Sequence, residues 1–135
     1  MASALSPEKF AKDHADHQLA AVEAGLPVKM LRVLMRDYGF TIGDFAEFIA
    51  SRRTLERRIA DGERLTVEES ERLGRLLRMV DLAMEVFKQP ARTRDWLRNT
   101  HWFLKDRSPL ELMRTENGGR LVEEQLLQLK WGFLA

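Results

Sequence analysis

Cysteine is absent from this sequence of 135 residues, and tyrosine occurs only once. A chain without thiols has no disulfide, no zinc finger built on cysteine and no cysteine nucleophile. The sequence also has no glycine-rich phosphate loop, no nucleophile spaced to meet a base and no pair of acids at catalytic spacing. We therefore expect a binding protein that is not an enzyme and requires no cofactor.

An excess of charge of one sign is also missing, because 22 lysines and arginines face 21 acids and leave a net charge of +1. This balance argues against a protein that coats polyanions, so any contact with nucleic acid must come from a local patch. No apolar run approaches the roughly 20 residues of a membrane helix, and the N-terminus does not resemble a signal peptide. We expect a cytoplasmic protein that does not contact a membrane.

Arginine is concentrated in one stretch, SRRTLERRIADGER at residues 51–64, which holds five arginines and only three acids. If residues 53–60 form a helix, Leu55 and Ile59 lie on one face at a spacing of four residues. Arg53 and Arg57 then point away from that face, with Thr54 and Arg58 beside them and Arg52 just before. Arginines on an outer helix face can contact phosphates or guanine edges, as a recognition helix does. The spacing alone fits a solvated basic face equally well.

Two predicted helices precede the arginine helix. The first covers Val28–Tyr38 and ends at Gly39, and the second covers Ile42–Ala50 and is capped by Thr41. Ser51 is the predicted cap of the arginine helix itself. The helix at 42–50 and the arginine helix are joined by a tight turn, which indicates a helix-turn-helix motif. In such a motif the second helix, here the arginine helix, enters the major groove of DNA.

A long helix follows, because Thr66 and Glu69 form a capping box and the apolar period continues to about Phe87. Gly74 lies inside this helix at a cost of about 1 kcal/mol against alanine. Close approach of a neighbouring helix, including one across a dimer contact, would compensate that cost; simple tolerance is the alternative.

The region before residue 28 carries weaker signals. Ser6 and Pro7 predict a helix start. His14 and His17 stand beside aspartates, but with no third ligand in sight they indicate polar surface and no metal site.

After Pro90 the pattern predicts short helices at Ala91–Arg98 and Leu110–Arg114, a turn at Thr115–Gly119 and a last helix at Arg120–Trp131. The loop Asn99–Arg107 contains His101, Trp102, Phe103 and Leu104, which we expect to form a buried aromatic cluster. His101 has no residue spaced as a catalytic partner.

The last helix is apolar on two sides. Val122, Leu126, Leu129 and Phe133 share one stripe, which should pack on the rest of the domain. Leu127, Trp131 and Leu134 form a second stripe more than 90° away on average. Packing within the chain or a partner protein could cover the second stripe, and a tryptophan near the C-terminus suits an interface anchor.

Several segments together resemble the MbcA/ParS/Xre antitoxin family. They are RTLERRIADGERLTVEESERLGRLLRMVDLAMEVF at 53–87, DWL at 95–97, LKDRSPLELMRTENGGRLVEEQL at 104–126 and the terminal LKWGFLA. The similarity covers roughly residues 28–135. In the usual bipartite pattern of the family, the interval that corresponds to Ala46–Leu55 is one residue longer, which predicts an atypical turn.

The resemblance implies an all-α fold, with an Xre-like helix-turn-helix followed by a small helical toxin-binding domain. It divides the chain into an N-terminal extension at 1–27, a DNA-binding and dimerisation region at 28–88 and a toxin-binding domain at 89–135. It further implies a homodimer that neutralises a RES-domain toxin acting on NAD or ADP-ribosylating proteins, and that represses its own operon.

Carried over by position, Arg53, Thr54, Arg57 and Arg58 are the implied DNA contacts, and we add the preceding Arg52 to the predicted set. The resemblance places the C-terminal helix and tail, with Lys130, Trp131 and Phe133, at or near the mouth of the toxin's NAD pocket. We add Leu127, Leu134 and Ala135 to the predicted toxin contacts. Two alternatives remain open: a stand-alone transcriptional regulator without a toxin partner, and an adaptor without DNA activity.

Overall fold

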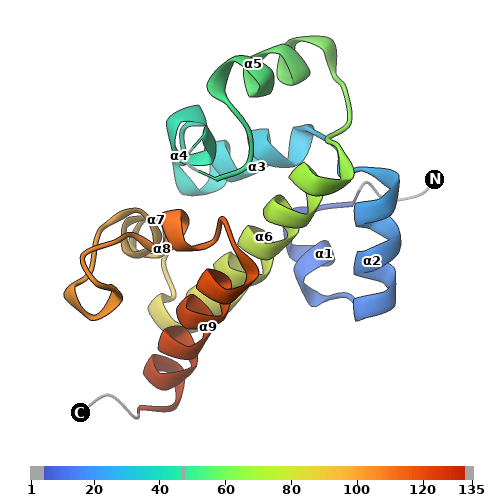
Figure 1. Cartoon of the computed structure of the whole chain (residues 1–135). Helices are drawn as coiled ribbons and strands as arrows, with labels where there is room; N and C mark the ends of the chain where they lie inside the picture. Colours follow the sequence, from blue (N-terminus) through green and yellow to red (C-terminus); the bar gives the residue numbers. More distant parts are fainter. Residues whose placement is uncertain (1–4, 47, 133–135) are drawn as a thin grey trace.

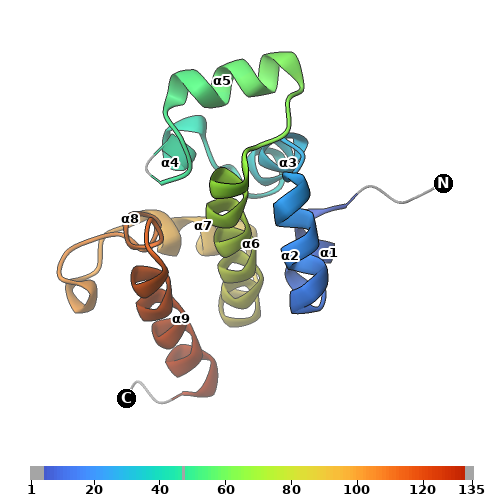
Figure 2. The ribbon, with the colours of Figure 1, turned by 45° about the vertical axis from the view of Figure 1, so that its right-hand side comes forward.

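The computed structural model describes residues 5–46 and 48–132, and in this part of the chain it contains helices and no strand. The helices are α1 (Pro7–Lys12), α2 (Ala15–Ala24), α3 (Lys29–Tyr38), α4 (Ile42–Ala46), α5 (Arg52–Asp61), α6 (Val67–Phe87), α7 (Pro90–Arg98), the 3-10 turn η1 (Trp102–Leu104), α8 (Pro109–Leu112) and α9 (Glu116–Trp131). Helix α6 runs through the centre, with α1 and α2 on one side and α9 on the other (Figures 1 and 2).

The core forms around the apolar stripe of α6. Leu73, Leu76, Leu77 and Val80 are buried, whereas Met84 and Phe87, nearer the carboxyl end, are only half-buried. Side chains from α3, α4, α5 and α9 complete the same cluster, among them Leu31, Phe45, Leu55 and Leu126. A single core of this kind supports both the arginine helix and the last helix, because each inserts its apolar edge into it.

Helix starts follow the sequence closely. The hydroxyls of Ser6, Ser51, Thr66 and Ser108 each accept a hydrogen bond from the backbone N–H three residues later. Thr66 and Glu69 form the predicted reciprocal capping box, and α6 ends at Phe87 as expected. Local capping therefore confirms most of the predicted helix boundaries.

Gly74 is explained by contact within the chain. A Cβ built at this position would lie 3.0 Å from Cζ of Phe10, a side chain that is only 1% exposed. Alanine at this position would require the ring of Phe10 to shift by a few tenths of an ångström, so the close approach of α1 to α6 offsets the helix cost of glycine.

Three predicted boundaries are wrong. Helix α4 covers Ile42–Ala46 and does not reach Ala50, α8 ends at Leu112 and not at Arg114, and α9 begins at Glu116 and not at Arg120. The double glycine, predicted as a turn, lies in the first turns of α9. A Cβ at Gly118 would fall 1.8 Å from the carbonyl oxygen of Leu112, so glycine is required there for close packing.

The prediction of a buried aromatic cluster in the loop before α8 is correct for some residues and wrong for Trp102. Leu104 is buried, and His101 and Phe103 are half-buried, but the side chain of Trp102 is 84% exposed. Because neighbouring residues in η1 point in different directions, only part of this apolar run can face the core.

In the part of the chain that the structure describes, no helix is both long enough and apolar enough to cross a membrane.

Candidate nucleic-acid and partner-binding surfaces

Helix α5 presents an outer face of basic residues. Leu55 is fully buried and Ile59 half-buried, so the opposite side carries Arg53 and Arg57 into solvent, and Arg52 is exposed at the first position of the helix. The hydroxyl of Ser51, which caps the helix, lies 3.0 Å from the hydroxyl of Thr54. This hydrogen bond fixes the first turn of α5 and holds Thr54 half-buried beside the exposed arginines.

The arginines of α5 differ in their partners. Arg58 is only 13% exposed, and its Nε and Nη2 lie 2.8 and 3.1 Å from the two carboxylate oxygens of Glu69 on α6. Arg57 is 58% exposed, and its Nε lies 3.6 Å from Glu63. Only the Nη2 contact has hydrogen-bond geometry, and the Nε contact is an ion pair by distance. A pair that excludes water is held firmly, whereas an exposed pair at the longer distance is easily exchanged.

Arg52 and Arg53 form no ion pair with any residue in the described ranges. The guanidinium of Arg52 lies close to Gly43 of α4: a Cβ built on this glycine would be 3.3 Å from Nη2 of Arg52. Arg52, Arg53 and Arg57 therefore form the accessible basic surface, which we call the α5 face. Arg58 shares the helix but not this surface.

Most other arginines that bond across the fold hold backbone carbonyls at helix ends or in the turns that follow them, where helical hydrogen bonds are missing. The donor–acceptor pairs are Arg64 to Gly25 (2.7 Å), Arg72 to Ile49 (3.0 Å), Arg75 to Met113 (2.7 Å), Arg94 to Tyr38 (3.0 Å) and Arg98 to Gly39 (3.3 Å). Partial burial lowers the pKa of Arg75 from its usual value. Sequence reasoning missed this role because each partner is distant in the chain.

One arginine also forms a charged bridge between α7 and α4. Nε and Nη2 of Arg98 lie 3.0 and 2.6 Å from the carboxylate oxygens of Asp44, which is 8% exposed. Asp44 additionally accepts a hydrogen bond from the N–H of Thr41 at 2.8 Å. The carboxylate therefore caps α4 and fixes it to the segment that follows α6.

Helix α9 buries one stripe and exposes another, as its sequence indicates. Val122 and Leu126 are fully buried, whereas Leu127 is 37% and Trp131 63% exposed. Leu121, which the sequence analysis did not single out, is 45% exposed, but it lies on another side of α9. We call Leu127 and Trp131 the α9 face. Phe133, Leu134 and Ala135 lie outside the described residues.

Lys130 lies between α9 and α6. Its ammonium is 3.1 Å from a carboxylate oxygen of Glu85 and 5.2 Å from the ring centre of Trp131. The charge is thereby directed along the rim of the α9 face, and the cation–π contact orients the tryptophan ring.

The two surfaces lie at opposite ends of the molecule. Helix α5 is at one end in both views, and the carboxyl end of α9 is at the other (Figures 1 and 2). A ligand on one surface therefore leaves the other accessible.

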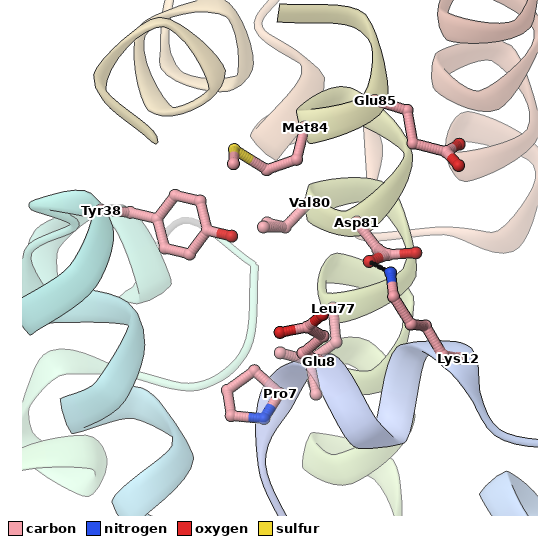
Figure 3. Close-up of a pocket in the computed structure, with 9 residues that line it drawn as sticks. All are labelled: Pro7, Glu8, Lys12, Tyr38, Leu77, Val80, Asp81, Met84 and Glu85. Atoms are coloured by element: carbon pink, nitrogen blue, oxygen red, sulfur yellow. Dashed lines mark hydrogen bonds and ion pairs between the residues drawn. The ribbon is translucent and has the colours of Figure 1, made fainter. Parts of the chain in front are cut away.

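A cavity of about 240 Å³ lies between α1, α3 and α6 (Figure 3). The ring of Tyr38 faces Val80 and Met84 across it, and an ion pair between Lys12 and Asp81 borders it. Burial is the main cause that raises the pKa of Tyr38. The volume is below the roughly 300 Å³ of typical ligand sites. Among the described residues no group of three His, Asp or Glu side chains could hold a metal ion.

Comparisons with known proteins match both halves of the chain. Residues 17–78 match the antitoxin Xre-like helix-turn-helix domain, and residues 82–132 match the antitoxin Xre/MbcA/ParS C-terminal toxin-binding domain. The first match begins at residue 17, earlier than the resemblance found from the sequence, and so includes most of α2.

Two curated relatives are each named Antitoxin Xre. The one from Pseudomonas putida is 35% identical over 81 residues, which is 60% of this chain and 51% of the relative. The one from Yersinia enterocolitica is 36% identical over 85 residues, which is 62% of this chain and 57% of the relative. The chain thus spans about half the length of the curated relatives it matches.

The α5 face falls inside the first matched domain and the α9 face inside the second, and the two matches together cover nearly all described helices. This chain belongs to the MbcA/ParS/Xre antitoxin family.

Proposed function

We propose that this chain is the antitoxin of a type II toxin–antitoxin pair. It binds a RES-domain toxin that consumes NAD or transfers its ADP-ribose, and it represses its own operon by binding operator DNA. The match of residues 82–132 to a toxin-binding domain, together with the solvent-exposed α9 face inside that segment, carries the proposal. Neither activity requires a catalytic residue of this chain.

Toxin binding is assigned to the α9 face and to the chain beyond it. Leu127 and Trp131 supply apolar contact area, and Lys130 supplies charge at the rim. A tryptophan with most of its ring in solvent is a strong interface anchor. Phe133, Leu134 and Ala135 follow in the sequence, and in the proposal they occlude the NAD pocket of the toxin.

DNA binding is assigned to the α5 face, with Arg52, Arg53 and Arg57 as the charged contacts and Thr54 beside them. Because Arg58 is engaged by Glu69, we assign it to holding α5 in place and not to contacting DNA. A homodimer would present two copies of α5 to half-sites one helical turn apart. In this proposal the helix-turn-helix region covers 28–88 and the toxin-binding domain 89–135, divided between α6 and α7.

The proposal predicts that the two surfaces can be inactivated separately. A variant with Leu127→Asp and Trp131→Ala should lose rescue of cells that express the RES-type toxin of the neighbouring gene, yet retain binding to the operon promoter. A variant with Arg53→Glu and Arg57→Glu should show the opposite behaviour. Growth assays and gel shifts with the same purified proteins measure both.

Matched controls are Leu19→Asp, which alters an apolar side chain that is 56% exposed on α2, and Arg120→Glu, which alters an exposed arginine on α9. Each should leave both activities intact. If the α9 variant still rescues growth, or the wild-type chain never does, the toxin-binding assignment fails. Promoter binding without any neutralisation would instead establish a stand-alone regulator.

A further inference from the structure

The exposed ring of Trp102 is the observation that the α9 face does not explain. It is 84% exposed, the most exposed of the large apolar side chains in the described ranges. Its chain neighbours behave differently, since Leu104 is buried and Phe103 packs against the core. Exposure of this ring is therefore a property of one side chain and not of a loosely packed loop.

The loop that carries Trp102 is closed by its own hydrogen bonds. His101 N–H donates to the carbonyl of Arg107 at 3.2 Å, Asp106 N–H to that of His101 at 3.0 Å, and Lys105 N–H to that of Trp102 at 3.1 Å. The His101 ring also bonds the carbonyl of Trp96 on α7, at 2.8 Å. Such a loop loses little conformational freedom when a partner binds.

A series of ring contacts ties the loop to the helices behind it. Centroid distances are 5.7 Å from Phe87 to Trp96, 5.1 Å from Trp96 to His101, 5.0 Å from His101 to Phe103 and 5.7 Å from Phe103 to Trp102. Trp102 is the last ring of this series and the one in solvent. Exposed Lys105, Asp106 and Arg107 follow it in the same loop and supply charged groups of the kind found at the polar rim of an interface.

We propose that Trp102 is a second anchor for the toxin, separate from the α9 face, that inserts into an apolar depression on the toxin surface. The inference rests on the proposed function. Trp102 lies within the matched toxin-binding segment. Its loop and the carboxyl end of α9 both lie on the side of the molecule away from α1 and α2 (Figures 1 and 2). One partner protein can therefore contact both.

Calorimetric titration of the full chain against an inactive form of the RES-type toxin of the neighbouring gene tests the proposal. Trp102→Ala should raise the Kd about 30-fold, as expected for an aromatic anchor. Leu19→Ala is the matched control, because Leu19 is an exposed apolar side chain outside the toxin-binding domain. It should change the Kd by no more than about twofold. Because Trp102 is exposed, its variant should keep the wild-type melting temperature and helical content.

A direct readout comes from incorporating 5-fluorotryptophan into this chain only. Its three signals, from Trp96, Trp102 and Trp131, are assigned with single Trp→Phe variants. On addition of unlabelled toxin the Trp102 signal should shift and become insensitive to solvent. A Trp102 signal that stays unchanged while the Trp131 signal shifts overturns the second anchor.

The outcomes separate this inference from the proposed function. If Trp131→Ala weakens toxin binding but Trp102→Ala does not, the proposed function stands and the second anchor is overturned. If the wild-type chain does not bind the toxin, both fall. If Trp102→Ala reduces self-association in sedimentation and leaves toxin affinity unchanged, the ring contacts another copy of this chain and the inference is overturned.

Discussion

Arg57 and Arg58 are adjacent on α5, yet one faces solvent and the other is enclosed. Arg57 is 58% exposed with a carboxylate at 3.6 Å, whereas Arg58 is 13% exposed and bound by both oxygens of Glu69. The same contrast is found elsewhere in the molecule. The side chains of Arg52 and Arg53 are exposed to solvent, whereas Arg94 and Arg98 donate hydrogen bonds to the carbonyls of Tyr38 and Gly39 between α3 and α4. Arginine content therefore does not measure a nucleic-acid surface; only the unengaged guanidiniums contribute to it.

The largest expected effect concerns the enclosed pair. Arg58→Ala should lower the free energy of unfolding by about 3 kcal/mol, because it leaves the Glu69 carboxylate with little water and no cation. Urea denaturation monitored by circular dichroism measures this. Arg57→Ala is the matched control and should cost less than about 0.5 kcal/mol.

Glu69→Gln sharpens this prediction, since glutamine retains the capping-box hydrogen bond but carries no charge. The double variant with Arg58→Ala should recover part of the lost stability. Equal stability losses for Arg57→Ala and Arg58→Ala would remove the distinction between open and enclosed arginines.

The second effect concerns the bridge between α7 and α4. Arg98→Ala should cost about 1.5 kcal/mol, less than Arg58→Ala because the Arg98 side chain is 36% exposed and water partly replaces it. Removing Arg98 also frees the carbonyl of Gly39. Hydrogen exchange should increase in α4 first. Arg92→Ala is the control, because Arg92 is an exposed arginine on α7, the helix that also carries Arg98, and this variant should leave exchange unchanged.

The third effect appears in DNA binding and not in stability. Arg57→Ala should reduce the slope of log affinity against log salt by about 0.9, the value for one phosphate contact. Arg58→Ala, assayed well below the melting temperature of the variant, should change the slope little, because the charge of Arg58 is already paired with Glu69 and does not neutralise a phosphate. Promoter titrations at several salt concentrations decide this, and an equal change for both residues would contradict the assignment.

The smallest effect concerns an ion pair in the N-terminal helices. The hydrogen bond from His17 to Asp13, 2.9 Å long, raises the pKa of His17 above 6.5 and lowers that of Asp13 below 3.8. The His17 contribution to stability is thus complete below pH 6.5 and is lost as the pH rises through its folded pKa. The Asp13 contribution is present above pH 3.8 and is lost as the pH falls through its folded pKa.

NMR titration of the His17 ring checks this sign. Asp13→Asn should return the pKa of His17 toward 6.5, since the charged acceptor is removed. A pKa that stays raised in this variant would assign the shift to another group, such as Asp16.

Features of the fold that depend on residues close in sequence were predictable. The caps at Ser51 and Thr66, the extent of α6 and the two apolar stripes of α9 all follow from spacings of three or four residues. In the candidate site, the outward direction of Arg53 and Arg57 follows from the period of α5. The family resemblance added the two-domain reading, which the comparisons confirm.

Tertiary structure alone decided which of these side chains remain available. Arg58 meets Glu69 across 11 positions, Arg75 meets Met113 across 38 and Arg98 meets Asp44 across 54. Gly118 is required because Leu112 packs against it, and Trp102 faces solvent because Leu104 and Phe103 occupy the core beside it. Helical periodicity gives the direction of a side chain, but whether that direction leads to solvent, to a carbonyl or to an opposite charge depends on which distant segment the core brings there.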